Sequence, residues 1–549
     1  MDLIEGNTYF VSASDTILHK SGSTSSSALN HLLMGDYMRY LGEETRNWAK
    51  VQCRGSKGFV RKADFSDERL LEVNFVDIGQ GDGCHIVTPE DEIILIDAGE
   101  GQNMHRFLRW RYNLRHLKVT GVDGVLNGDS KARPPINIDN IVITHPDMDH
   151  YYGFKTIFED HKLKPRRIYH NSIVERPIKA ADKLADLKYY SGDDLGGYLN
   201  KDGNKYIWDV VHGSAEMHTL INKHKTTRKR YIQTLKEAVD NNADIKFNSL
   251  NKDSGFMPGY EEDKTLRFKV LGPITENVSF AGKSKRGLVR LGAESITKNG
   301  HSVVLQLQFG KLKVMLGGDL NTQSEDHLLK VYAETGKEVS QLEERMFALQ
   351  AKGNNVNIEQ AQELAELETE VNAIVTKARR SLQVDVTKAC HHGSHHFSET
   401  FLRSLNPIAT IISSGDNEAY SHPRPDALGA IGKFGRGVRP LIFSTELARS
   451  TKEFTDVFAY FERLKAFEKR IEEASSKSQK RKIKREMQDA RDRNVVVYGL
   501  ITLRTDGNKV ILAQKIEAPT KLSKKWDVHE LAFNEDLGQL EYVRASKAH

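Results

Sequence analysis

Two histidines and two aspartates fall within six positions of the chain, at His145, Asp147, Asp149 and His150. Imidazole and carboxylate groups are ligands for divalent metal ions, and this number of them suits two ions. The preceding run 141–143 is apolar and β-branched, which predicts a short buried strand. A polar turn with solvated charges would also account for the composition, but the spacing and the strand context favour a metal site.

Other residues of the same chemical types follow other apolar runs. They are Asp97, Asp319, the pair His391 and His392, and His422. One sheet can deliver all of these side chains to one edge, and active sites gather at such edges. The sequence therefore predicts an α/β domain in which several strands converge on one metal centre.

Six short motifs in this order resemble the metallo-β-lactamase fold, and most closely the hydrolase domain of ComEC-type competence proteins. The matching segments are 77–82 (DIGQGD), 96–99 (IDAG), 145–150 (HPDMDH), 318–320 (GDL), 391–394 (HHGS) and 421–423 (SHP). The resemblance covers residues 71–515, with interruptions. It implies an αββα sandwich that binds one or two metal ions and, for the ComEC-like subgroup, cleavage of phosphodiesters in DNA.

The resemblance also implies roles for the ligands. His145 and Asp147 are expected to hold one ion, and Asp149 and His150 the second, with Asp319 bridging both. Two ions about 4 Å apart would support two-metal hydrolysis. Asp149 is accordingly counted among the catalytic residues as well as the ligands.

A later histidine completes the second ion's ligands, and three residues compete for that place. His391 is favoured as the ligand, which leaves His392 or His422 as the general acid that protonates the leaving oxygen. Asp97 is expected to orient a ligand from behind the metals.

The sequence departs from the commoner family pattern at Asp147, where the family usually has a histidine. The family also has a separate histidine between the cluster and the bridging aspartate. No residue of this sequence matches it clearly, and His170 and His301 are the candidates. A carboxylate in place of an imidazole hardens the site, so Mn²⁺ becomes a rival to Zn²⁺, with Mg²⁺ a further candidate.

Three polar residues follow the histidine pair. His395 and His396 are expected at the surface of the loop. Ser394 lacks the Gly-x-Ser-x-Gly context of a nucleophile, and we expect it to cap the next helix.

The chain divides into two predicted domains. Residues 1–68 contain short strands at 8–11, 37–41, 48–51 and 58–60 around a Ser-rich loop at 21–27, an order that resembles a bacterial Src-homology-3-like (SH3-like) barrel. Such a barrel binds a peptide, glycan or neighbouring domain, or merely packs on the next domain. The hydrolase domain spans 69–549, with expected insertions at about 176–262, a helical hairpin at about 321–381 and a charged helical arm at about 455–494.

Composition limits the class of protein. The chain has 549 residues and 38% apolar residues, with a net charge of only +5, so overall charge does not argue for nucleic acid. Its three cysteines are far apart and fit reduced thiols. With no secretory signal and no transmembrane run expected, a cytoplasmic protein without membrane contact is predicted.

Three functions remain open from the sequence. The first is a metal-dependent nuclease acting on DNA, in a phage-defence or toxin-type system, supported by basic clusters at 223–230, 283–290 and 477–485. The second is a hydrolase of a small phosphodiester or lactone. The third is a non-catalytic scaffold in which the barrel and helical arms bind a partner protein or a second copy.

Overall fold

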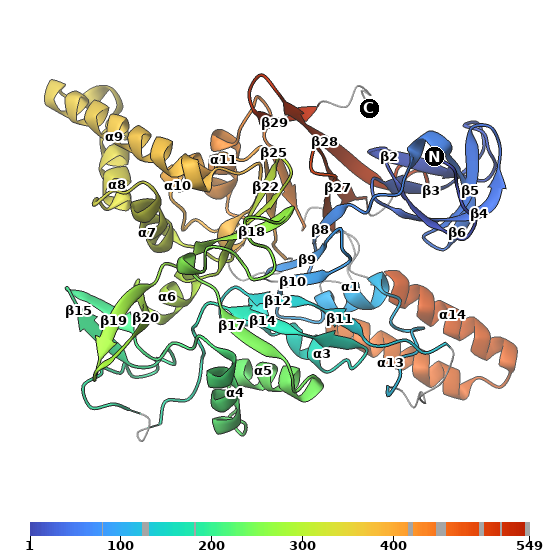
Figure 1. Cartoon of the computed structure of the whole chain (residues 1–549), viewed down its shortest axis with the longest axis horizontal. Helices are drawn as coiled ribbons and strands as arrows, with labels where there is room; N and C mark the ends of the chain where they lie inside the picture. Colours follow the sequence, from blue (N-terminus) through green and yellow to red (C-terminus); the bar gives the residue numbers. More distant parts are fainter. Residues whose placement is uncertain are drawn as a thin grey trace.

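A computed structural model describes residues 1–79, 81–122, 131–179, 183–415, 421–445, 457–493, 499–516 and 519–543 (Figure 1). Gln80 of the glycine-rich motif lies outside these residues. Residues 455–456 and 494 of the predicted 455–494 arm also lie outside them, as do residues 495–498 of the predicted strand 495–504. Across the described ranges, helices long and apolar enough to cross a bilayer are absent.

The N-terminal residues form a seven-stranded antiparallel sheet with its own core. Its strands are β1 (Thr8–Val11), β2 (Asp15–His19), β3 (Ala28–Leu33), β4 (Tyr37–Glu44), β5 (Trp48–Cys53), β6 (Ser56–Arg61) and β7 (Phe65–Ser66). The four predicted strands are confirmed. β2 and β3, which flank the Ser-rich loop, and the short β7 were not predicted.

A ten-stranded sheet follows, in the order β17-β14-β12-β10-β9-β8-β26-β27-β28-β29. The strands are β8 (Leu71–Phe75), β9 (Gly83–Val87), β10 (Ile93–Ala98), β12 (Asn140–Ile143), β14 (Arg167–His170), β17 (Lys246–Ser249), β26 (Ile501–Thr505), β27 (Lys509–Lys515), β28 (Trp526–Asn534) and β29 (Gln539–Val543). β10, β12, β14 and β17 run parallel, so their carboxyl ends meet at one edge.

A six-stranded sheet packs against the ten-stranded sheet. Its strand order is β18-β21-β22-β23-β24-β25. Its strands are β18 (Leu266–Gly272), β21 (Val304–Phe309), β22 (Leu312–Leu316), β23 (Val386–Lys388), β24 (Ala409–Ile412) and β25 (Leu441–Ser444). The core between the sheets contains Ile86 and Ile94 from one sheet and Leu305 and Val314 from the other. Burial of these apolar side chains holds the two sheets together face to face.

Helices cover the outer face of each sheet. The first sheet carries α1 (Asn103–Arg111), α3 (Phe154–Phe158) and α5 (Arg230–Asn241). The second carries α7 (Thr322–Tyr332), α9 (Ile358–Leu382) and α10 (Glu399–Leu405). β10 alternates accordingly, because Leu95 packs under the helices and Ile94 between the sheets. The layers are therefore αββα, as the sequence predicted (Figure 1).

The predicted insertion, residues 176–262, also supplies a strand of the ten-stranded sheet. Their first part adds β15 (Tyr198–Lys201) and β16 (Asn204–Ile207), which join β19 (Glu276–Phe280) and β20 (Lys283–Val289) in a small sheet. Their second part contains α4 (Ser214–Lys223), α5 and β17, and β17 is a strand of the central sheet.

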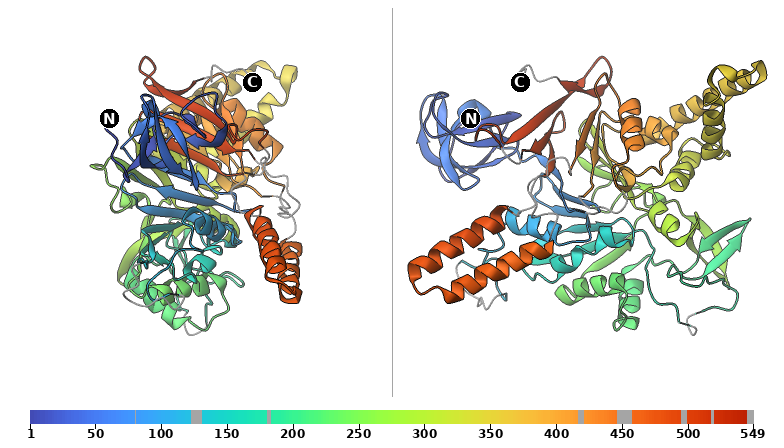
Figure 2. Two further views of the ribbon diagram at one scale, coloured as in Figure 1. Left: turned by 90° about the vertical axis from the view of Figure 1, so that its right-hand side faces the viewer. Right: turned by 180° about the vertical axis from the view of Figure 1, so that it is seen from behind.

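Two helical hairpins project from the body. α8 (Val339–Gln350) and α9 turn at residues 353–355, as predicted, and α13 (Val457–Glu473) and α14 (Lys477–Arg493) form the charged arm (Figure 2). The remaining elements are β11 (Ile136–Ile138), β13 (Leu163–Pro165), α2 (Met148–Tyr151), α6 (Glu294–Gly300), α11 (Pro425–Phe434) and the short turns η1 (Lys62–Asp64), η3 (Lys252–Ser254), η4 (Gly353–Asn355) and η5 (Cys390–Gly393).

Candidate metal centre

Asp97, at the end of β10, holds the histidine motif in place. Its Oδ1 accepts a hydrogen bond from the Thr144 backbone N–H at 2.8 Å, and its Oδ2 accepts one from the Thr144 hydroxyl at 2.7 Å. The same Oδ2 lies 2.8 Å from Nδ1 of His150. A carboxylate on Nδ1 directs the other nitrogen, Nε2, toward the centre of the site.

Four side chains from three different segments meet in front of that nitrogen. Asp149, His150, Asp319 and His392 each offer a ligand atom within 4.8 Å of the others. Nε2 of His150 and Nε2 of His392 both lie 3.2 Å from Oδ2 of Asp319. Oδ2 of Asp149 lies 3.5 Å from the His392 nitrogen. Two carboxylates and two imidazoles in this arrangement are a ligand set for one divalent ion.

The burial of these atoms supports the fit to a metal. Nε2 of His150, Nε2 of His392 and Oδ1 of Asp319 are inaccessible to solvent and make no hydrogen bond within the described part of the chain. Buried polar atoms normally have partners, so unsatisfied ligand atoms that converge on one point indicate a cation. Burial alone would lower the pKa of His150, but the carboxylates of Asp319 and Asp97 raise it well above its ordinary value.

A second corner of the site is built from His145 and Asp147. Nε2 of His145 lies 3.7 Å from Oδ2 of Asp147, and the His145 and His150 rings are 4.1 Å apart. Burial lowers the pKa of His145 to about 4, so its imidazole is neutral and able to ligate. Nζ of Lys298 lies 2.6 Å from Oδ1 of Asp147, which leaves this carboxylate shared with an ammonium group.

The glycine-rich loop braces the metal motif from behind. Gly81 has a φ of +101°, and a Cβ at this position would overlap the carbonyl oxygen of Asp149. The next residue, Asp82, is buried and donates its backbone N–H to that same oxygen at 3.3 Å. Its carboxylate pairs with Lys388, and its Oδ1 lies 3.3 Å from Nδ1 of His392. The hydrogen bond of that same Nδ1 goes to the Ser413 carbonyl oxygen at 3.0 Å, so a backbone carbonyl orients the His392 ring.

Lys388 is a functional candidate that sequence reasoning missed. Its ammonium group is buried, donates to the Gly318 carbonyl at 2.9 Å and lies 3.8 Å from Oδ1 of Asp319. A lysine in the apolar strand β23, three residues before the histidine motif, was the available signal. Lys298 was missed as well, because it is far from the motifs in sequence.

The site opens into a cavity of about 390 Å³. Asp147, Asp149, Asp319 and His392 lie on its wall. His391 and His422 line the same wall, with ring centroids 5.8 Å apart. Cavities of this size accept small molecules or single nucleotide units.

Comparison with known proteins agrees with this geometry. The model of the metallo-beta-lactamase superfamily matches residues 84–384, more than half of the chain. The chain belongs to the metallo-beta-lactamase superfamily. Membership indicates a metal-dependent hydrolase, and the cluster of aspartates and histidines supplies the ligands such an enzyme needs.

A relative of known name gives a looser indication. The chain is 22% identical over 359 residues to ComE operon protein 3 of Bacillus subtilis (strain 168). The aligned region covers 65% of this chain and 30% of that protein, so the chain spans less than a third of the relative's length. This similarity supports the ComEC-like subgroup only in outline.

The structure separates the two adjacent histidines of the segment 391–394. In the described residues, the four-ligand cluster contains His392 and not His391, the residue favoured from the sequence. Both residues have a left-handed backbone, with φ of +48° and +55°, and this pairing of conformations sends their rings to different places. Alternation along a chain does not predict such a turn, which is why the sequence left the choice open.

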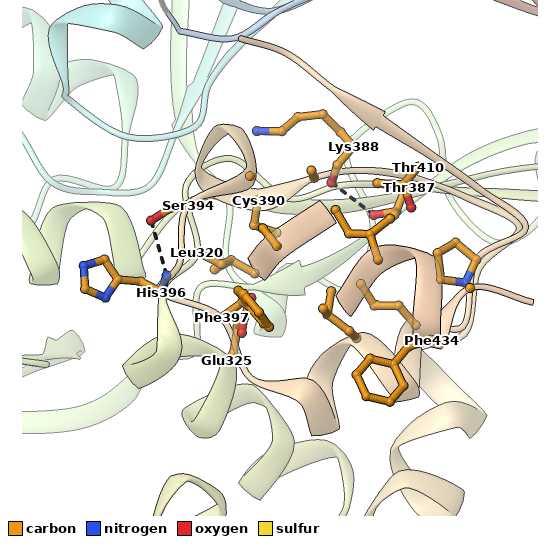
Figure 3. Close-up of a pocket in the computed structure, with 18 residues that line it drawn as sticks. Leu320, Glu325, Thr387, Lys388, Cys390, Ser394, His396, Phe397, Thr410 and Phe434 are labelled. Atoms are coloured by element: carbon orange, nitrogen blue, oxygen red, sulfur yellow. Dashed lines mark hydrogen bonds between the residues drawn. The ribbon is translucent and has the colours of Figure 1, made fainter. Parts of the chain in front are cut away.

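Ser394 does not have the capping role expected from the sequence. The residue that caps α10 is Ser398, whose hydroxyl accepts from the Phe401 N–H at 3.1 Å. Ser394 instead accepts a hydrogen bond from the His396 N–H at 3.3 Å, beside an apolar cavity behind the loop (Figure 3). His395 and His396 are exposed, as predicted.

Neither candidate for the missing histidine reaches the cluster. Nδ1 of His170 accepts from the Ser172 N–H at 3.1 Å, and Nε2 of His301 lies 2.6 Å from the Val289 carbonyl oxygen. A hydroxyl stands close to His145 instead, since Oγ of Ser302 lies 3.2 Å from its Nδ1.

Proposed function

We propose that this chain is a metal-dependent phosphodiesterase that cleaves DNA. The observation that carries the proposal is the cluster of Asp149, His150, Asp319 and His392 beside an open cavity. Buried ligand atoms of three of its members, His150, Asp319 and His392, make no hydrogen bond within the described residues. The resemblance of the motifs to the ComEC-type hydrolase domain, together with the similarity to ComE operon protein 3, supports DNA as the substrate.

Each residue then has a defined part in hydrolysis. Asp149, His150, Asp319 and His392 would hold one ion, and His145 and Asp147 would help to hold a second. The bound ions supply Lewis-acid stabilisation of the phosphoryl oxygens and activate water. Asp97 and the Ser413 carbonyl keep the His150 and His392 imidazoles in the ligating orientation.

The proton for the leaving oxygen comes from a group that is not a ligand. Because His392 is assigned to the metal, His422 is the proposed general acid. It lines the cavity, and its ring lies 6.1 Å from that of His392. His391 lines the same wall and is the second candidate for this proton.

One basic side chain stands at the rim of the cavity. Nη1 of Arg230 lies 3.0 Å from Sδ of Met148, a cavity residue, and its guanidinium group lies over the Tyr152 ring. Arg230 therefore belongs to the proposed backbone-binding surface. The 283–290 cluster contributes less, because Arg286 and Arg290 are paired with Asp253 and Asp193.

The ligand chemistry makes Mn²⁺ a rival to Zn²⁺. The proposed site has three carboxylates and three imidazoles, because Asp147 stands where the family usually has a histidine, and hard oxygen ligands suit Mn²⁺ and Mg²⁺. For the N-terminal sheet we propose an SH3-like binding role, and for the two helical hairpins contact with a partner protein or a second copy. Such contacts fit a nuclease held in check within a phage-defence or toxin-type system.

The test is a nuclease assay of the full chain on plasmid and single-stranded DNA with Mn²⁺, Mg²⁺ or Zn²⁺. We expect cleavage with Mn²⁺ and at least a hundredfold loss in Asp149→Ala. His395→Ala is the matched control, since this exposed histidine follows the same loop. Turnover of a small chromogenic phosphodiester or a lactone without DNA cleavage would replace the proposal by a small-molecule hydrolase. Absence of any turnover with metal bound would favour the scaffold.

A further inference from the structure

A second cavity, of about 660 Å³, lies where the N-terminal sheet meets the ten-stranded sheet. Tyr37 and Arg54 line it from the N-terminal sheet, and Glu72 and Arg504 line it from β8 and β26. Helix α1 closes one side with Trp110 and Arg111, and Trp526 of β28 completes the wall. None of these residues belongs to the metal centre.

The wall carries more positive than negative charge. Three guanidinium groups share two buried carboxylates. Arg54 forms two hydrogen bonds with Asp36, at 2.9 and 2.7 Å, and Arg504 donates to the same carboxylate at 2.7 Å. Arg111 donates to Glu72 at 3.0 Å, and Arg504 lies 3.7 Å from that residue.

Part of this donor capacity is unused. Nε of Arg111 and Nε of Arg504 are buried and make no hydrogen bond to the part of the protein that the structure describes. Arg69, also on the wall, pairs at 2.6 Å with Asp91, which is largely exposed. Lys515 is close by, with its Nζ 5.9 Å from the Trp110 ring, and burial together with Arg54 and Lys525 lowers its pKa to about 8. Four arginines therefore face the three carboxylates of Asp36, Glu72 and Asp91, which leaves an excess of cations around the cavity.

Flat aromatic faces accompany the charges. The Arg54 guanidinium lies 5.6 Å from the Trp526 ring centroid. Trp110 is 41% exposed and Tyr37 is 53% exposed, so both rings are accessible to a ligand. Guanidinium groups recognise phosphate oxygens in pairs, and aromatic rings stack on nucleobases.

We propose that this cavity binds a nucleotide, with its phosphate on the Arg111 and Arg504 guanidinium groups and its base against Trp110 and Tyr37. The nucleotide comes either as a free mononucleotide or as the phosphorylated end of a strand. This site is separate from the metal centre and does not depend on the nuclease assignment.

Binding is measured by calorimetry and tryptophan fluorescence on the full chain in EDTA, so that metal-dependent binding at the other cavity is absent. The probes are AMP, ATP, inorganic phosphate and a 5′-phosphorylated oligonucleotide. We expect AMP or ATP to bind, with affinity at least tenfold weaker in Trp110→Ala and Arg111→Gln. Arg109→Gln, an exposed position on the same helix, is the matched control and should bind as the wild type does.

Three results would overturn the proposal. They are no nucleotide binding at millimolar concentration by folded protein, inorganic phosphate binding as tightly as AMP, and equal weakening by Arg109→Gln. Tighter binding of the phosphorylated oligonucleotide than of AMP would assign the site to strand ends, and the reverse to free nucleotides. Thermal melting of each variant confirms that it is folded.

Discussion

The contact between Asp97 and His150 allows the orientation of one metal ligand to be tested without touching the ligand. Asp97→Asn keeps the shape and retains an oxygen for the Thr144 N–H, but it places an NH₂ group where Oδ2 now lies 2.8 Å from Nδ1 of His150. Nδ1 must then accept a hydrogen bond, so the ring proton moves to Nε2. That nitrogen faces Asp319, and a proton on it competes directly with a metal ion.

Loss of a residue that orients a metal-ligating histidine weakens metal affinity by about 10- to 100-fold, or about 1.4 to 2.7 kcal/mol. Asp97→Asn should fall in this range for Mn²⁺, measured by calorimetry or chelator competition. DNA cleavage should return in part at saturating metal, because the ligands themselves are intact.

The matched control is Asp160→Asn. Asp160 makes the same type of contact, with Oδ2 2.9 Å from Nε2 of His105, outside the metal cluster. It should leave metal affinity unchanged. If Asp97→Asn bound Mn²⁺ as tightly as the wild type, or if both variants lost affinity equally, the assigned role of Asp97 would be wrong.

Three further predictions concern the choice between His391 and His392 as ligand, Gly81 in the glycine-rich loop, and Asp36 where the N-terminal sheet meets the ten-stranded sheet. His392→Ala should lose one bound ion in metal analysis. His391→Ala should retain that ion and lose at most a part of its turnover. The reverse pattern would restore His391 as the ligand, as assigned from the sequence. Gly81→Ala should cost about 2 to 4 kcal/mol in denaturant unfolding and weaken metal binding, because its Cβ would displace Asp149; an unchanged unfolding midpoint would contradict this. Burial raises the pKa of Asp36, but the guanidinium groups of Arg54 and Arg504 lower it overall from 3.8 to about 2. The ionised carboxylate therefore stabilises the folded protein fully above pH 4, and this stabilisation is lost as the pH falls toward 2. Asp36→Asn should remove about 2 kcal/mol of that acid-sensitive stability, seen as a shallower fall of melting temperature between pH 4 and 2.

Much of the architecture was predictable because it depends on local patterns. β-branched runs such as 141–143 and 93–96 are long enough to identify buried strands, and each ligand motif follows one of them directly. The C-terminal strands β28 and β29 were not predicted. Their residues alternate weakly, and their place at the sheet edge comes from pairing of β28 with β27 and of β29 with β28.

The sequence by itself determined the family, the layered α/β fold and the group of residues that meets at the metal centre, because adjacent ligands such as Asp149 and His150 are set by local spacing. Tertiary structure alone decided which members of that group lie close together. His392 rather than His391 reaches Asp319 because two left-handed residues redirect the loop, and Lys388 and Asp82 join them because separate strands end at the same place. Contacts between residues hundreds of positions apart depend on packing of whole sheets, and no local pattern records them.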